Sequence, residues 1–82
     1  MDAYPIITWK FETGIVRSNP KIAGGAALVD GCGISAETLI FAIGVEGGIE
    51  QAAKAYGVEV RHLMLAREYV EFMDRVAAME AT

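Results

Sequence analysis

The chain has 82 residues, of which 54% are hydrophobic and 22% are charged, and its formal net charge at pH 7 is −4. This composition excludes an intrinsically disordered chain, and the negative charge removes the general attraction to phosphate that most nucleic-acid-binding proteins have. We expect a single domain over residues 1–82, with strands and turns in 1–34 and helices in 35–82. A chain this short buries only about 60% of the surface that its unfolded form exposes, so association with a second copy is expected.

Neither a membrane span nor a secretion signal is apparent in the sequence. No apolar run reaches the roughly 18 residues that indicate a transmembrane helix. The start, Met1 to Pro5, lacks the basic and apolar regions of a signal peptide. The single cysteine, Cys32, cannot form an internal disulfide, which is typical of a reducing compartment. We therefore expect a cytoplasmic protein with no membrane contact.

The first part of the chain has the patterns of short β-strands. Within residues 6–12, Ile7, Trp9 and Phe11 alternate strictly with polar residues, which predicts a half-buried strand. Thr13-Gly14 is a turn signal, and a second strand over 15–17 gives a hairpin. Asn19-Pro20 ends that strand, and a third extended piece is expected over 28–30. Strands this short do not form a sheet core alone, so helices must cover them.

The second part of the chain has helical patterns. Ser35 is a favourable N-cap for a helix that is expected to end at Gly44. A second helix is predicted over 49–56, where Gly57 stops it. A last helix is predicted over about 59–79. The predicted fold class is α+β, mainly α, in which short N-terminal strands precede a three-helix unit with a long C-terminal helix.

The last predicted helix is apolar around about half of its circumference, whereas a surface helix usually needs a stripe of roughly 100°. One arc is expected to face the chain's own core. The second arc is predicted to contact another copy or a partner protein. The alternative is that the strand face with Trp9 and Phe11 covers it. The predicted dimer or partner interface consists of Leu65, Tyr69, Phe72, Val76, Met79 and Trp9.

The glycine-rich segment before the first helix resembles a nucleotide-binding loop only superficially. Residues 31–36 spell G-x-G-x-x-A, but Glu50, the candidate ribose-binding acid, lies in a helical segment and not at the end of a second parallel strand. No Gly-Lys-Ser/Thr follows Gly24-Gly25, which excludes a P-loop. We therefore expect no cofactor and assign these glycines to turns. The predicted structural turn residues are Pro20, Gly24, Gly25, Gly31, Gly33 and Gly57.

No catalytic or metal-binding group of residues is evident. Cys32 and His62 are thirty positions apart, and nothing in the sequence brings them together for thiol activation. One cysteine and one histidine are too few for a structural zinc site. Glu68 and Glu71 lie on the solvated face of the last helix, where carboxylates are ordinarily unperturbed. We expect that the protein is not an enzyme.

A helix-turn-helix motif is indicated by the spacing of Ala53, Gly57 and Leu63, which are a small residue at a helix crossing, a turn glycine and an apolar anchor. Arg61 suits guanine, and His62 is within reach of a phosphate or base edge in such a motif. A purely structural three-helix unit is the alternative. The candidate DNA-binding residues are Arg61, His62, Lys54, Arg17 and Lys21.

The run IVRSNPKIAGGAALVDGCGISAETLI, followed by a helix ending at Tyr56-Gly57 and by LMLAREYVEFM, resembles the domain-of-unknown-function family 433 over residues 15 to about 73. The resemblance implies short strands, a glycine turn and a homeodomain-like three-helix unit. Lys-Pro and Thr-Arg of the family pattern are replaced by Ala26-Ala27 and Cys32-Gly33, so two basic residues are missing. The matching positions are Asn19, Pro20, Ile22, Gly24, Gly25, Gly31 and Ile34.

This family includes VapB-type antitoxins, which are encoded beside PIN-domain-like ribonuclease toxins. The resemblance therefore implies an antitoxin-like regulator that binds double-stranded DNA as a homodimer and neutralises a PIN-domain-like toxin. The alternative function is a protein-interaction or dimerisation module that has the same fold and does not bind DNA. The acidic charge and the two missing basic residues favour this alternative.

Overall fold

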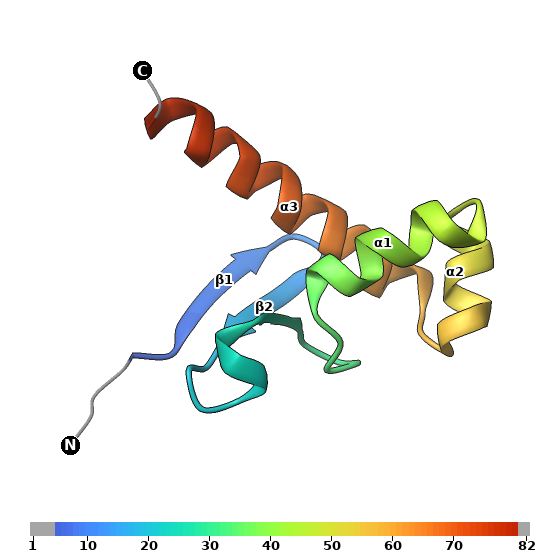
Figure 1. Cartoon of the computed structure of the whole chain (residues 1–82), viewed down its shortest axis with the longest axis horizontal. Helices are drawn as coiled ribbons and strands as arrows, with labels where there is room; N and C mark the ends of the chain where they lie inside the picture. The colour runs from blue at the N-terminus through green and yellow to red at the C-terminus, as the bar shows by residue number, and fades with distance from the viewer. Residues whose placement is uncertain (1–4, 81–82) are drawn as a thin grey trace.

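The computed structural model describes residues 5–80 as a three-stranded sheet followed by three helices (Figure 1). The helices contain 11, 8 and 21 residues and the strands five, five and three, so the α+β, mainly α class is confirmed. The elements are β1 Ile7–Phe11, β2 Gly14–Ser18, the 3-10 turn η1 Ala23–Gly25, β3 Ala27–Val29, α1 Ala36–Glu46, α2 Ile49–Tyr56 and α3 Val60–Glu80.

The sheet is antiparallel throughout, with the strand order β1-β2-β3. Trp9 pairs with Val16, and Val16 pairs with Val29, so these three residues share one face of the sheet. Val16 and Val29 on that face are fully buried against the helices. Arg17 pairs with Leu28 on the opposite face. An antiparallel sheet differs from the parallel βαβ unit that a dinucleotide loop requires.

Helix α1 begins where the sequence predicted but ends later than predicted. The Ser35 side chain accepts a hydrogen bond from the Thr38 backbone N–H at 3.1 Å, as predicted for an N-cap. The predicted C-terminal end at Gly44 is wrong, because α1 continues to Glu46 and is capped by Gly47 in the left-handed conformation. A glycine inside a helix costs only about 1 kcal/mol, which the packing of α1 offsets.

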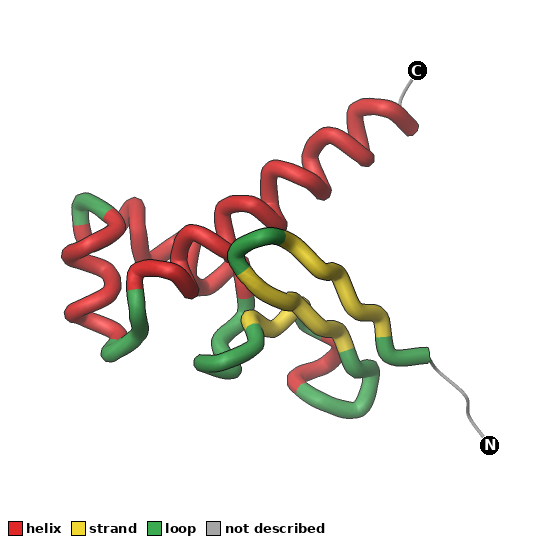
Figure 2. The backbone as a smooth tube through the Cα atoms, turned by 180° about the vertical axis from the view of Figure 1, so that it is seen from behind, coloured by secondary structure: helices red, strands yellow, loops and turns green. Residues whose placement is uncertain are grey.

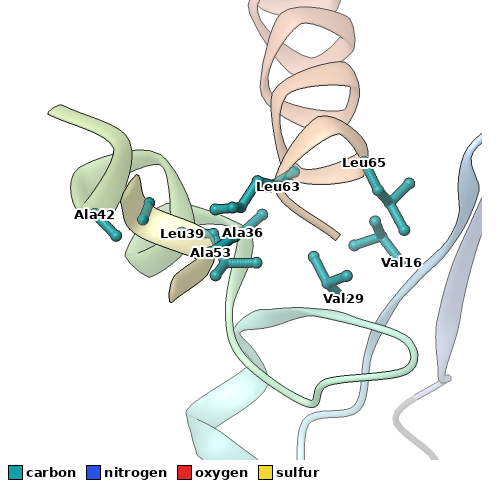
Figure 3. Close-up of a cluster of buried hydrophobic side chains, with 10 residues drawn as sticks. Val16, Val29, Ala36, Leu39, Ala42, Ala53, Leu63 and Leu65 are labelled. Atoms are coloured by element: carbon teal, nitrogen blue, oxygen red, sulfur yellow. The ribbon is translucent and has the colours of Figure 1, made fainter. Parts of the chain in front are cut away.

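The core lies where the sheet meets the three helices. In Figure 3, Leu65 of α3 faces Val16 of β2, and Leu63 is directed toward α1 and α2. The sheet approaches α3 so closely that a Cβ on Gly14 would lie 2.9 Å from the Leu65 side chain. The fully buried side chains of α1 and α2 that share this core are Ala36, Leu39, Ala42 and Ala52.

Helix α3 is the longest element, and its C-terminal half extends past the other elements in both views (Figures 1 and 2). Its four buried residues, His62, Leu63, Leu65 and Ala66, all lie in the first two turns. No residue from 67 to 80 is buried. One half of α3 is therefore a core helix, whereas the other half is a surface helix.

Candidate functional site

The turn between α2 and α3 is formed by residues 57–59. Gly57 has φ +67° and ψ +32°, a left-handed conformation that favours glycine, and its backbone N–H bonds to Ala53. Ala53 and Leu63 are both buried where α2 meets α3. The small residue, the turn glycine and the apolar anchor of the predicted helix-turn-helix therefore occupy the expected places.

His62 is not available as a DNA-contacting residue, which corrects the sequence-based prediction. Its side chain is only 6% exposed, because it packs under the turn after β3. The ring Nδ1 accepts a hydrogen bond from the Glu59 backbone N–H at 3.2 Å. The buried Nε2 has no hydrogen-bond partner among the described residues. A Cβ on Gly31 would lie 2.6 Å from Nε2, so the absence of a side chain there makes room for the imidazole.

Arg61 is exposed at the start of α3, but its charge is already matched. Its Nε lies 2.8 Å from Glu59 Oε1, in a hydrogen-bonded ion pair. The hydrogen bond and the charge of Arg61 hold the pKa of the Glu59 carboxyl below its usual value. Farther along α3, Arg67 borders a shallow hollow together with Glu68 and Glu71. Acidic groups thus stand beside each arginine that a phosphate would approach.

The other candidate DNA-binding residues do not join Arg61 in one patch. Lys54 lies on α2, whereas Arg17 lies on β2 and Lys21 in the turn before η1. All three are exposed. Figures 1 and 2 show α2 and the sheet at opposite ends of the molecule. The structure therefore does not bring the predicted set together on a single nucleic-acid-binding face.

The predicted interface on α3 is partly covered by the chain's own sheet, which is a second correction. Leu65 is 1% exposed, so its assignment to an interface is wrong. Trp9 packs edge-on against Tyr69 with ring centroids 5.0 Å apart, and Phe11 packs in the same way against Phe72 at 5.7 Å. The alternative given by the sequence, cover by the strand face with Trp9 and Phe11, therefore applies to this stretch.

Only the end of the predicted arc lies beyond the sheet. Val76 is half-buried and Met79 is exposed in the last turns of α3. Their assignment to a dimer or partner interface stays a prediction.

Two strongly exposed apolar side chains also lie on α1. Phe41 and Val45 are 68% and 60% exposed, one helical turn apart on the side away from the core. The opposite side of the same helix contributes Leu39 and two alanines to the core. The sequence contained this signal, because α1 has apolar residues on two opposite sides. The predicted interface lies mainly on the long last helix, α3, and includes no residue of α1.

The outer face of the sheet, turned away from the helices, holds an open cleft of about 460 Å³. Its apolar lining includes Leu28 and two exposed isoleucines, Ile6 and Ile22. Arg17 and Asp30 are the charged residues in the lining. No motif in the sequence points to this cleft, because the turn at 19–25 and the start of β1 form its walls only in the folded chain.

The predicted turn residues lie in turns. Pro20 lies in the turn that follows β2. The glycines with positive φ include Gly24, Gly25, Gly31, Gly33 and Gly57.

The turn after β3 also brings His62 next to a neighbour of Cys32, which the sequence did not indicate. The Cys32 thiol lies 3.8 Å from the Val29 carbonyl oxygen, its one hydrogen-bond partner in the described part of the chain.

Within residues 5–80, no cluster of three or more His, Cys, Asp or Glu side chains has an arrangement that could hold a metal ion. None of the helices described combines the length and the apolar character needed to cross a membrane.

Comparison of the chain with family models, with curated proteins and with solved structures gave no match.

Proposed function

We propose that this chain is a small, non-enzymatic, antitoxin-like module that works through protein contacts in the cytoplasm and pairs with a second copy of itself through α1. The observation that carries the proposal is that α1 is apolar on two opposite sides. Leu39 is buried in the core, whereas Phe41 and Val45 are exposed. A helix that is apolar on two opposite sides is ordinarily covered on both.

The amount of exposed surface supports association. The chain exposes 5459 Å², whereas a folded protein of 8.8 kDa is expected to expose about 4,800 Å². The excess is of the same order as the roughly 800 Å² that each partner contributes to a standard protein–protein interface.

The charges of α1 predict how the dimer responds to salt. The helix carries Glu37 and Glu46 and no basic residue. Two antiparallel copies bring these carboxylates toward one another, and added salt screens such exposed charges. Dimerisation therefore strengthens as the salt concentration rises.

Sedimentation velocity at micromolar concentration tests the α1 dimer. The wild-type chain is expected to sediment as a dimer and the Phe41→Glu variant as a monomer. Ile22→Glu is the matched control, because Ile22 is also an exposed apolar residue but lies on the sheet side, away from α1. A monomeric wild type, or a dimer that survives Phe41→Glu, contradicts the proposal.

The toxin in this proposal rests on the resemblance to family 433. A PIN-domain-like ribonuclease encoded next to the chain is the expected partner. Co-expression of the two proteins tests this: a stable complex in which ribonuclease activity is suppressed supports the antitoxin role. An adjacent ribonuclease that stays active and separate in the presence of the chain contradicts it.

DNA binding is the second candidate function, and the geometry of the α2–α3 turn favours it. The left-handed Gly57 and the buried Ala53 and Leu63 form the frame that a recognition helix needs. Exposed Arg61 would be the principal base-contacting residue, once freed from Glu59. Phosphate contacts make affinity fall steeply with salt, which is opposite to the salt response of the α1 dimer.

A salt titration with duplex DNA from upstream of the chain's own gene tests the second candidate. Arg61→Gln is expected to weaken binding, whereas Arg75→Gln, on the extended half of α3, is the matched control. No binding at low salt contradicts DNA recognition while leaving the protein-binding proposal intact.

A further inference from the structure

We propose that the cleft on the outer face of the sheet is the docking site for an acidic segment of a partner protein. The segment inserts an apolar side chain between Ile22 and Leu28 and places a carboxylate against Arg17. This inference rests on the proposed protein-binding function and gives the chain a second contact surface, separate from α1.

The shape of the cleft suits a side chain that a partner presents. Its volume of about 460 Å³ exceeds that of one large apolar side chain and lies within the range of ligand pockets, roughly 300 to 1,000 Å³. Ile6 and Ile22 are 58% and 51% exposed, so one side of the cleft is open to water. A free small molecule would stay largely hydrated there, whereas a partner that carries the anchor also covers the opening.

The charge around the cleft selects an acidic partner. The Arg17 side chain makes no hydrogen bond or ion pair with any of residues 5–80, although Asp30 lines the same cleft. Lys10 shares the outer face with Arg17, because the two lie on adjacent strands at non-core positions, and Lys21 adjoins Ile22. Arg17 and Asp30 are thus the charged residues in the lining, while Lys21 adds a positive charge next to it and Lys10 adds one on the same face, in a chain whose net charge is −4. This local reversal of charge attracts and orients a negatively charged segment.

Arg17 has the chemistry needed to recognise a carboxylate. Its planar guanidinium forms two parallel hydrogen bonds to a carboxylate, a geometry that a lysine lacks. Leu28 lies directly opposite Arg17 on β3. A partner segment with an apolar residue next to an acidic one can therefore contact Leu28 and Arg17 at the same time.

The walls of the cleft are fixed before any partner arrives. The Asn19 side chain accepts a hydrogen bond from the Lys21 backbone N–H at 2.9 Å, and the Ser18 hydroxyl donates to the Gly25 carbonyl at 2.7 Å. On the other side, the Asp30 backbone N–H bonds to Ile15 at 2.9 Å. A preformed cleft loses little conformational entropy on binding, so a short segment suffices for measurable affinity.

A nuclear magnetic resonance titration of the full-length, isotope-labelled chain tests the inference. The probe is a synthetic peptide of alternating leucine and glutamate with blocked ends, and the matched probe has lysine in place of glutamate. We expect the acidic peptide to shift the backbone amides of Arg17, Leu28, Gly31 and Gly33, and the basic peptide to leave them in place.

Two variants locate the binding. Ile22→Asp puts a like charge in the apolar part of the cleft and is expected to weaken the acidic peptide at least about tenfold. Arg17→Gln removes the carboxylate partner and is expected to weaken binding by a smaller factor. Met64→Asp, at an exposed apolar residue of α3 outside both proposed surfaces, is the control and leaves the affinity unchanged. All three positions are exposed or line the cleft, so we expect the substitutions to leave the core intact. The spectrum of each variant without peptide checks that the fold is retained.

The opposite results overturn the inference. They are no amide shifts with the acidic peptide, equal binding of the basic peptide, or an affinity that Ile22→Asp leaves unchanged. The α1 proposal fails separately, when Phe41→Glu leaves the sedimentation unchanged. Sedimentation therefore tests binding through α1, and the peptide titration tests the cleft, so that either proposal can fail while the other holds.

Discussion

The two halves of α3 share one sequence pattern but have different surroundings. Both carry apolar residues on two adjoining arcs. In the first half, the sheet covers one arc and α1 the other, and four residues are buried. In the second half, Phe72 packs against Phe11 of β1, and no side chain is buried. Helical periodicity therefore identifies the apolar residues of α3 that could be buried. How far the β1–β2 hairpin extends along α3 determines which of them are buried.

The largest expected difference between the halves is in core packing. Leu65→Ala is expected to lower the free energy of unfolding by about 3 kcal/mol, because it leaves a cavity between α3 and the sheet. Val76→Ala, in the second half, is expected to cost less than about 1 kcal/mol, because its site is already partly hydrated. Urea denaturation followed by circular dichroism measures both. Equal effects would show that the second half is packed as tightly as the first.

The next largest effect is expected where the turn after β3 holds the first half of α3. Gly31 has φ +105°, and an added Cβ would lie 2.6 Å from the His62 ring. Gly31→Ala is therefore expected to destabilise the fold by about 2 kcal/mol, through strain and overpacking. The double variant Gly31→Ala, His62→Ala separates the two causes, because removing the imidazole relieves only the clash.

The matched control for that turn is Gly33→Ala. Gly33 also has positive φ, but a Cβ there would meet nothing within 4 Å. Its cost is expected to be smaller than that of Gly31→Ala and independent of His62. A cost at Gly31 that is no larger than at Gly33 would show that the imidazole does not constrain the turn.

The sequence predicted the elements of the fold because their signals are local. The alternation before Thr13, the N-cap at Ser35 and the glycine at 57 each act within a few residues, and each is found as predicted. The end of α1 was predicted wrongly, because Gly44 is tolerated inside a packed helix. Local chemistry thus defined the elements more reliably than their ends.

The candidate sites were less predictable because they depend on contacts between distant residues. His62 is buried by a turn thirty positions away, and Leu65 by a hairpin fifty positions away. The hydrophobic pattern of α3 does not reveal how far β1 extends along it. The cleft beside Arg17 likewise exists only after β2, β3 and the turn at 19–25 have come together.

The aromatic pairs mark the boundary between the halves, and their coupling is expected to be modest. A double-mutant cycle of Trp9→Ala and Tyr69→Ala is expected to give an interaction energy of about 1 kcal/mol, as edge-to-face pairs do. Trp9→Ala combined with Val76→Ala is the control, and we expect the two effects to add. A coupling of similar size in the control would place Val76 under the sheet as well.

The smallest expected effect is a pH dependence at Tyr69, the half-buried residue that packs against Trp9 of β1. Burial beside Trp9, and secondly the negative charge of Glu37, raise the pKa of the Tyr69 hydroxyl above its ordinary value of 10.0. The unfolded chain then loses this proton at a lower pH than the folded chain. The contribution to stability is therefore complete below pH 10 and is lost as pH rises through the higher pKa of the folded state.

Tyr69→Phe is expected to remove this part of the alkaline destabilisation, measured by urea denaturation at increasing pH. Tyr56→Phe, at an exposed tyrosine on α2, is the matched control and is expected to leave it unchanged. Glu37→Gln is expected to reduce the dependence without abolishing it, because burial is the larger cause. If Tyr69→Phe has no effect, Tyr69 is as hydrated as the second half of α3, and the boundary between the two halves lies closer to Leu65.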